Sequence, residues 1–368
     1  MSELRDLIAA ASALRASRTP FISATVVSVQ GSAYRRPGAR MLATEGTWQA
    51  GSISAGCLER DVLGKGFWRT QSGSAVRVRY AEAEDALEEA RGSGCQGVID
   101  YLLERWDPAQ STAADPWLCL ERCWRDEAPG VLVTVSRAPG AALGTHAWLS
   151  AGKFETSATD PELSAALRAA AAAALHTGPA TRVTQLAAAG PHPEHLELLV
   201  ERILPPPHLF IFGSGHDVDP VLRLAKQLGW TVSVWDGQPR FSARERLRAA
   251  DHYLGGPLTD AVRQLQRAAQ PLAMVMGHDL AQDQEVLAAL LTCRLLYLGV
   301  LGPQRRTQQM LQRLTAAGVR SAESTLAKLR GPAGISLGAQ TPAEIALSIV
   351  AQMQEALHLA ATSGEASP

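Results

Sequence analysis

The sequence predicts an α/β protein in which an α+β domain with glycine-rich cysteine loops precedes a doubly wound parallel sheet. In the first half, β-like runs mix with glycine turns and a few helical stretches. In the second half, apolar strands alternate regularly with amphipathic helices, as in parallel α/β sheets. The stiff run Pro205–Pro207 separates the two patterns. We therefore expect domains at residues 1–204 and 205–368.

Composition narrows the classes of partner. The 368 residues are 46% hydrophobic and 19% charged, which is ordinary for a globular protein. The 35 basic and 36 acidic residues give a formal net charge of −1, which does not favour nucleic acid or an anionic membrane. Residues 1–18 resemble an amphipathic helix and not a signal peptide, and no apolar run approaches the roughly 20 residues that span a bilayer. We expect a cytoplasmic protein without nucleic-acid or membrane partners.

The N-terminal domain should consist of short strands, glycine turns and helices. Residues 191–203 are interpreted as a short polar segment before the prolines. The expected strands cover residues 24–29, 75–80 and 98–103, and the expected helices cover residues 1–18, 81–91 and 161–176.

A faint internal repeat runs through this domain. It favours a duplicated strand-turn-strand element, although chance matches between glycine-rich β segments give the same pattern. In equal register, Val27, Val29, Gly38, Gly46 and Trp48 align with Val133, Val135, Gly144, Gly152 and Phe154.

Cys57 follows a glycine-rich turn and precedes a helix expected to begin near Leu58. Glycines let successive backbone N–H groups converge on an anion, and the positive end of a helix lowers the pKa of a thiol. The turn is therefore predicted to hold a phosphate through Gly51, Ser52 and Gly56, and to present a thiolate.

Cys95 stands in a second glycine loop, Gly92–Gly97. The alternative for both loop cysteines is a small, partly buried hydrophobic side chain beside a turn. The remaining cysteines do not form a metal or disulfide pattern, because Cys119 and Cys123 are spaced Cys-x-x-x-Cys and Cys293 is isolated. We expect no metal site and no disulfide framework.

The C-terminal domain has a clear strand and helix rhythm. Asp219 and Pro220 are expected to cap and begin its first helix, and residues 341–344 form a capping box before the last one. The expected strands cover residues 209–212, 231–235, 272–276 and 295–300, and the expected helices cover residues 221–228, 261–269, 284–291, 308–317 and 341–353.

A glycine loop lies between the first strand and first helix of this domain, where dinucleotide-binding loops occur. Gly213, Gly215 and His216 belong to this loop, and Asp236 ends the next strand about 20 residues later. These residues predict a Rossmann-like domain that binds a nucleotide. Val218 replaces the third glycine, and acidic residues flank it, which argues against a standard NAD mode. The alternative is a glycine turn that any doubly wound sheet requires.

Two further loops follow strands. Arg305 and Arg306 open a helix and are predicted to make charge-assisted bonds to phosphate, with a solvated helix start as the alternative. His278, Asp279 and Asp283 follow another strand; helix capping explains the aspartates more simply than acid–base or metal chemistry does.

Taken together, these runs resemble the xanthine dehydrogenase accessory family of the XdhC/CoxI type over nearly the whole chain. Their order and number make the resemblance specific. The matching runs are Gly31–Met41, Gly51–Glu59, Gly94–Gly97, Gly213–His216, Tyr297–Gly302, Gly331–Gly334 and Thr341–Ile349.

The resemblance implies a cofactor carrier or chaperone, typically dimeric, and not a catalyst with its own turnover. Its cargo would be molybdenum cofactor, as molybdopterin or its dinucleotide form. A cysteine desulfurase would be its partner in sulfuration, and a molybdenum hydroxylase its client. Cys57, Cys95 and Glu59 would serve the reactive end of the cofactor, and Arg36 would help to bind it.

Two other functions remain open from the sequence. One is an NAD(P)-dependent oxidoreductase that uses the Rossmann-like domain; the missing third glycine and the lack of a convincing proton donor count against it. The other is a structural assembly factor for a large enzyme.

Overall fold

The computed structural model describes residues 2–54, 56–80, 97–110, 114–138, 142–175, 181–186, 196–237, 241–319 and 322–363. The chain forms two compact units, Glu3–Leu204 and Pro205–Pro368, here called the N-terminal and C-terminal units. Within the described ranges, no helix combines the length and apolar character needed to cross a membrane.

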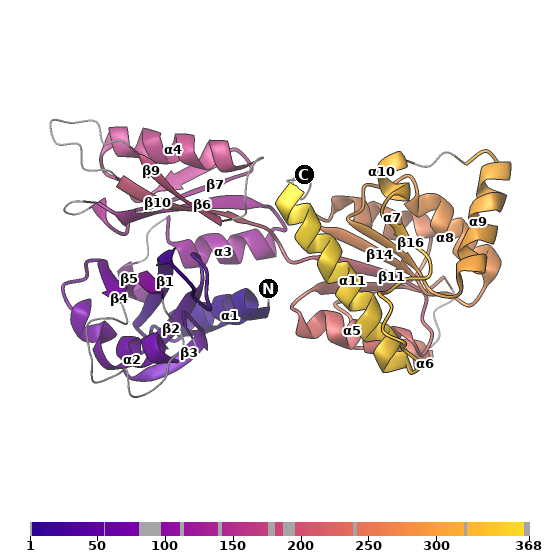
Figure 1. Cartoon of the computed structure of the whole chain (residues 1–368), viewed down its shortest axis with the longest axis horizontal. Coiled ribbons are helices and arrows are strands. Elements are labelled where there is room, and N and C mark those ends of the chain that lie inside the picture. The colour runs from indigo at the N-terminus through magenta and orange to yellow at the C-terminus, as the bar shows by residue number, and fades with distance from the viewer. Residues whose placement is uncertain are drawn as a thin grey trace. The chain divides into compact units, whose positions relative to one another are not determined.

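The N-terminal unit contains two five-stranded antiparallel sheets (Figure 1). The first has strand order β3-β2-β1-β5-β4, and the second has order β8-β7-β6-β10-β9. The first set of elements is α1 (Ser2–Ala16), β1 (Phe21–Gln30), β2 (Arg40–Thr44), β3 (Thr47–Gly51), α2 (Cys57–Arg69), β4 (Val76–Tyr80) and β5 (Val98–Trp106). The second set is α3 (Pro116–Arg125), β6 (Gly130–Arg137), β7 (His146–Ser150), β8 (Lys153–Thr156), α4 (Pro161–Leu175), β9 (Thr181–Leu186) and β10 (Leu196–Ile203).

The two sets follow the same path, so the unit is an internal duplication. Each has a helix, a three-stranded meander, a second helix and two final strands, and the strand orders correspond one to one. The turn glycines also correspond: Gly38 and Gly144 have φ of 94° and 79°, and their N–H groups donate to Val26 and Val135 at 2.9 and 3.0 Å. The predicted repeat therefore exists, but the predicted alignment of its valines is three residues out of register. The reason is that the connection from Val135 to Gly144 is shorter than the connection from Val26 to Gly38.

Two buried polar pairs join the repeats crosswise. Arg40 on β2 donates to Glu201 on β10 at 2.9 Å, and Nε2 of His146 on β7 lies 2.7 Å from Glu104 on β5. Arg40 and His146 occupy equivalent positions, each opposite a buried threonine on the neighbouring strand. Each repeat therefore completes a buried pair of the other.

The segment before the prolines differs from the sequence expectation. Residues 196–203, interpreted as polar, form β10, whose Leu198, Leu199 and Val200 are fully buried. Glu201 of this strand is buried as well, because its charge has a partner in Arg40. The expected acidic helix at 81–91 lies outside the described residues.

The C-terminal unit is a six-stranded parallel sheet of order β13-β12-β11-β14-β15-β16, so the predicted doubly wound sheet is confirmed. Helices α7, α8 and α9 bury one face, while α5 and α11 pack against each other and against β12 and β15 (Figure 1). The elements are β11 (His208–Phe212), α5 (Val218–Gln227), β12 (Thr231–Trp235), α6 (Phe241–Arg246), β13 (His252–Leu254), α7 (Leu258–Arg267), β14 (Pro271–Val275), α8 (Leu280–Leu290), β15 (Tyr297–Val300), α9 (Gln304–Ala316), α10 (Glu323–Leu326), β16 (Leu329–Arg330) and α11 (Pro342–Ser363).

Local capping signals hold here with small shifts. The capping box before α11 is confirmed, because Thr341 N donates to Glu344 at 3.0 Å and Glu344 N donates to Thr341 Oγ1 at 3.3 Å. The first helix, α5, begins at Val218 with Asp217 at its N-cap, so the predicted cap at Asp219 and start at Pro220 are wrong by two residues.

Candidate functional site

Cys57 is the first residue of α2, and its side chain is exposed. The turn that leads into it requires glycine. Gly51 has φ of 75°, and a Cβ there would lie 2.2 Å from the carbonyl oxygen of Arg40. Gly56, the N-cap of α2, has φ of 126°. The backbone of this turn is therefore specific to glycine and leaves the Cys57 side chain accessible.

Glu59 organises the same turn from within. Its carboxylate accepts hydrogen bonds from the N–H groups of Ile53, Ser54 and Gly56 at 2.8, 2.7 and 2.9 Å. The hydroxyls of Ser52 and Ser54 donate to it as well. Partial burial opposes ionisation, but the hydrogen bonds from Ser54 and Ser52 outweigh it and lower the pKa of Glu59 to about 2.

This arrangement corrects the predicted phosphate loop. The N–H groups expected to converge on a phosphate do converge on an anion, but the anion is the carboxylate of Glu59. Ser52 and Gly56 are donors to that carboxylate, and Gly51 permits the close approach to β2. Glu59 is therefore a positioning residue for the Cys57 turn.

Cys95 and Arg36 are the other predicted site residues of the N-terminal unit. Cys95 lies outside the described residues. The segment that carries it ends at Gly97, where a Cβ would lie 2.5 Å from the carbonyl oxygen of Ser32 in the β1–β2 loop. Arg36 is exposed in that same loop. The structure therefore places Arg36 and the end of the Cys95 segment on the loop that follows β1.

The remaining described cysteines differ from Cys57. Cys119 and Cys123 are buried in α3, and burial raises the pKa of their thiols to about 11 and about 12. Cys293 is buried too, and its pKa is also raised by burial. Among the described cysteines, only Cys57 is exposed, and no cluster of three potential metal ligands occurs in the described part of the chain.

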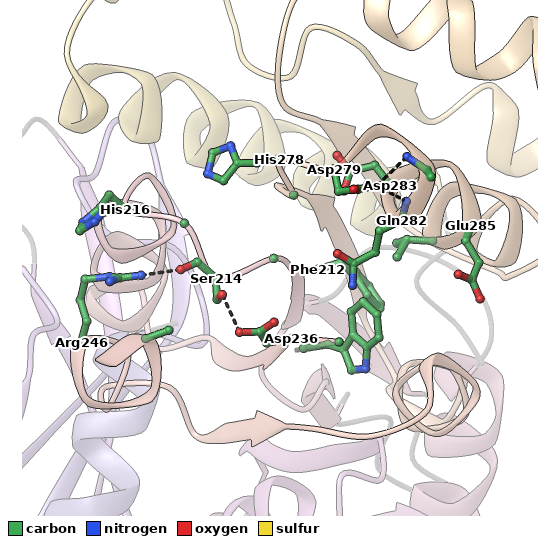
Figure 2. A pocket seen from close by; sticks show the side chains of 18 residues that line it. Phe212, Ser214, His216, Asp236, Arg246, His278, Asp279, Gln282, Asp283 and Glu285 are labelled. Carbon is green, nitrogen blue, oxygen red and sulfur yellow. Dashed lines mark hydrogen bonds between the residues drawn. The ribbon is translucent and has the colours of Figure 1, made fainter. Parts of the chain in front are cut away.

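A cavity of about 820 Å³ opens at the carboxyl ends of β11, β12 and β14 in the C-terminal unit (Figure 2). The chain leaves β11 for β12 on one side and returns to β14 on the other, which is the switch point where open α/β sheets bind ligands. The cavity is lined by the glycine loop after β11, the end of β12, Arg246 of α6 and the first turns of α8.

Asp236 stands at the centre of this cavity (Figure 2). It is 9% exposed, and its Oδ2 atom accepts hydrogen bonds from Ser214 Oγ at 2.6 Å and Tyr253 OH at 2.9 Å. Burial and the bond to Asp236 raise the pKa of Tyr253 to about 12, so the phenol stays a donor. No sequence motif points to Tyr253, which lies on the short strand β13.

The glycine loop has the close packing that a ligand loop requires. A Cβ at Gly213 would lie 2.5 Å from the carbonyl oxygen of Met276, and a Cβ at Gly215 would lie 2.5 Å from Nε2 of His278. His216 is exposed at the rim of the cavity. Arg246, which no sequence motif indicated, donates to the carbonyl oxygen of Ser214 and fixes the loop.

The sequence features that argue against a standard nucleotide-binding loop are Val218 and the acidic residues on either side of it. Val218, in place of the third glycine, is fully buried within the first turn of α5. Asp219 forms an ion pair with Arg223 at 2.8 Å, and neither it nor Asp217 is among the described residues that line the cavity. The two acidic residues therefore lie outside the described lining of the cavity.

Arg305 and Arg306 do not form the predicted phosphate clamp. Arg306 forms an ion pair with Asp283 at 2.6 Å and reaches the carbonyl oxygens of Leu301 and Gly277 at 3.3 and 3.4 Å. Asp283 is 2% exposed; burial raises its pKa, which the Arg306 charge partly offsets. Arg305 is exposed and outside the described lining. Arg306 thus positions Asp283 at the cavity wall.

Asp279 confirms the capping interpretation. It is the N-cap of α8 and accepts hydrogen bonds from Ala281 N and Gln282 N at 2.8 and 2.9 Å. His278, the preceding residue, lines the cavity over Gly215. Asp279 therefore caps the helix, while His278 forms part of the cavity wall.

Two family models match the chain. Residues 14–81 match the XdhC and CoxI family, and residues 209–353 match the XdhC Rossmann domain. A probable xanthine dehydrogenase subunit of Bacillus subtilis (strain 168) is 26% identical over 339 residues, which cover 90% of this chain and 92% of that protein. The uncharacterized protein YqeB of Escherichia coli (strain K12) is 30% identical over 153 residues, 40% of this chain and 27% of its own length.

A crystal structure of a xanthine dehydrogenase from Bacillus halodurans is similar in fold over the whole chain. The two share a TM-score of 0.76 and 26% sequence identity, and the match covers 98% of this chain and 96% of the other.

Proposed function

Because the chain belongs to the XdhC family, we propose that it is a maturation factor that carries molybdenum cofactor to a hydroxylase of the xanthine dehydrogenase or aldehyde oxidase kind. The similarity to a probable xanthine dehydrogenase subunit supports a role in maturing such an enzyme. In this proposal the cofactor is cargo. A cysteine desulfurase supplies its terminal sulfur, and a second copy of the chain completes a homodimer.

The observation that carries the proposal is the presentation of Cys57. Thiol sulfur is a soft ligand suited to a metal that already binds sulfur. Cys57 is exposed at the start of α2, on a turn whose shape is fixed by glycines and by Glu59. A thiol in a fixed position can contact the metal end of a cofactor without sealing it in a buried site. We therefore assign this contact to Cys57.

The test compares Cys57→Ser with Cys293→Ala, a control at a buried cysteine of the other unit. The folded variants are loaded with cofactor and mixed with desulfurase and apo-hydroxylase, and client turnover is followed. We expect Cys57→Ser to lower the rate of client activation about tenfold or more, by analogy with lost metal contacts. The control should activate normally. Normal activation by Cys57→Ser would exclude this role.

A carrier should also show no hydride transfer of its own. Loaded protein without client is incubated with hydroxylase substrates, and NAD(P)H absorbance is recorded. Sustained substrate-dependent turnover would instead identify an oxidoreductase.

A further inference from the structure

We propose that the outer face of helix α2, together with the adjoining tryptophan of β3, is the surface on which the hydroxylase client docks. The inference rests on the proposed function for the identity of the partner. It does not depend on the metal contact assigned to Cys57, which begins the same helix. The surface is here called the α2 face, and its members are all exposed: Trp48, Arg60, Gly64, Lys65 and Trp68.

The second repeat provides an internal reference for this surface. Helix α2 packs on β1 and β2, and α4 packs on the equivalent strands β6 and β7 (Figure 1). Val62 and Gly66 of α2 and Leu167 and Ala171 of α4 are buried at the same spacing. The packing of such a helix therefore does not require the side chains that α2 carries on its outer face. In this alignment the four helical positions of the α2 face correspond to Ala165, Ala169, Ala170 and Ala173.

Two tryptophans are exposed on the α2 face. Trp68 is 68% exposed and Trp48 is 54% exposed. Trp48 lies on the side of the sheet that α2 covers, because its cross-strand neighbour Ala43 belongs to the core below that helix. Its indole N–H donates to the carbonyl oxygen of Gly51 at 2.8 Å, at the start of the Cys57 turn. Tryptophan is enriched among the residues that dominate binding at protein interfaces, so these indoles favour a protein partner.

The exposed charges of the α2 face are positive. Arg60 forms no hydrogen bond or ion pair with another described residue. Lys65 is 63% exposed and lies 3.4 Å from Asp61. Asp61 is turned toward the protein, because it also accepts a hydrogen bond from Tyr101 OH at 2.6 Å and pairs with Arg69. A protein that covers this face should therefore present carboxylates to it.

Gly64 indicates a close approach by the partner. A glycine in a helix interior is less stable than alanine by about 1 kcal/mol. No contact within the described part of the chain requires glycine here, because a Cβ at Gly64 would have no atom within 4 Å. The missing side chain leaves space for the backbone or a side chain of another protein at the centre of the α2 face.

The position of the α2 face favours the client over the desulfurase. From Cys57 to Trp68 the helix extends about 16 Å, since each residue adds about 1.5 Å. A sulfur atom can be passed on in a brief encounter. A cofactor that leaves the thiol for a buried site must stay aligned with the entrance of that site during transfer. An extended docking surface beside the thiol therefore suits the hydroxylase.

The test measures binding of the whole chain to the apo-hydroxylase that the parent activates. Gly64→Gln fills the gap without harm to α2, because glutamine forms helices better than glycine does. We expect this variant to raise the dissociation constant about tenfold or more, with a free energy of unfolding equal to or above that of the parent. Ala169→Gln, at the equivalent exposed position of α4, is the matched control and should bind as the parent does.

Two further variants test the indole and the charge. Trp68→Ala and Arg60→Glu should each weaken binding about tenfold or more. Their controls, Leu347→Ala on α11 and Lys153→Glu on β8, change exposed residues outside the α2 face and should not. In activation assays the α2-face variants should raise the client concentration at half-maximal rate, whereas Cys57→Ser lowers the rate at saturating client. Failure of this inference and failure of the proposed function are therefore seen separately.

Three results would overturn the inference. The first is apo-hydroxylase binding by folded Gly64→Gln and Trp68→Ala that equals binding by the parent. The second is weaker binding of both variants to the desulfurase with normal binding to the apo-hydroxylase, which would assign the α2 face to the desulfurase. The third is binding of the parent to vesicles of phosphatidylcholine and phosphatidylserine that Trp68→Ala abolishes, which would assign it to a membrane surface.

Discussion

Glu59 shows how a charged side chain acts on the backbone of its own segment. Its carboxylate holds three N–H groups of the turn before α2, so the turn keeps one arrangement without a bound anion. Cys57 lies two residues earlier, on the first turn of the same helix. A change at Glu59 should therefore reach Cys57 through the backbone.

Glu59→Gln should loosen this turn, because the amide nitrogen is a donor where the turn supplies donors. We expect the free energy of unfolding of the N-terminal unit to fall by about 2 kcal/mol in urea titrations. The rate at which iodoacetamide alkylates Cys57 in the folded protein should change as well. Glu45→Gln, at an exposed position in the β2–β3 turn, is the matched control and should change neither quantity. An alkylation rate equal to that of the parent would exclude the positioning role.

Between elements, Arg306 connects the first turn of α9 to the first turn of α8. Its guanidinium, partly exposed, compensates the fully buried carboxylate of Asp283. Removal of one member of such a pair leaves a buried charge without compensation, which costs more than the loss of the bond itself. The adjacent Arg305 has no such task, since it is exposed.

Arg306→Ala should therefore destabilise the C-terminal unit by about 3 kcal/mol, while Arg305→Ala should stay within about 0.5 kcal/mol of the parent. Chemical denaturation of both variants measures the difference. The double variant Asp283→Asn, Arg306→Ala should recover part of the loss, because no charge is left buried. Equal stabilities of the two arginine variants would show that the ion pair contributes little.

The elements of the C-terminal unit were predictable because their signals are local. Strands followed by glycine, cap and proline residues indicated the parallel sheet, and Asp279 and the box at Thr341 cap helices as expected. Strand β10 was not predictable, because Glu201 looks solvent-facing until its partner Arg40, 161 residues away in the chain, is known.

The site was predictable only in part. The convergence of N–H groups before Cys57 follows from the glycines, but the identity of the bound anion depends on the conformation of the Glu59 side chain. Likewise, two adjacent arginines look alike in sequence, and only the buried position of Asp283 separates Arg306 from Arg305. Asp236 was found because its spacing from the glycine loop is a local rule, whereas Tyr253 required the fold.

At the scale of the whole molecule, the two units should respond to acid in different pH ranges. Burial lowers the pKa of His208 in β11 from 6.5 to about 4, with Ser233 within 2.8 Å of its ring. As the pH falls, His208 is protonated in the unfolded chain before it is protonated in the folded chain. The free energy of unfolding of the C-terminal unit therefore decreases as the pH falls from 6.5 toward 4. In the N-terminal unit, the pKa of Glu59 is lowered from 4.5 to about 2, so its contribution is lost only below pH 4.5.

Hydrogen exchange followed by mass spectrometry at several pH values, corrected for the intrinsic rate, tests this order. Core peptides of the C-terminal unit should lose protection between pH 6.5 and 4, before those around α2. His208→Asn should remove this step whatever its effect on stability at neutral pH, and His252→Gln, an exposed neighbour, should retain it. Simultaneous loss of protection in both units would contradict the separate ranges.

The crosswise pairs between the two repeats have a consequence for how such a unit can arise. A fragment that ends after β5 carries Arg40 without Glu201, and Glu104 without His146. Arg40 and Glu104 are themselves complementary in charge. Burial lowers the pKa of Arg40, but Glu201 and the charge of Glu104 raise it above its ordinary value. Two copies of that fragment could therefore neutralise each other's buried charges as a symmetric dimer. The duplicated chain is then equivalent to such a dimer joined into one polypeptide, with Cys57 at the start of the helix between β3 and β4.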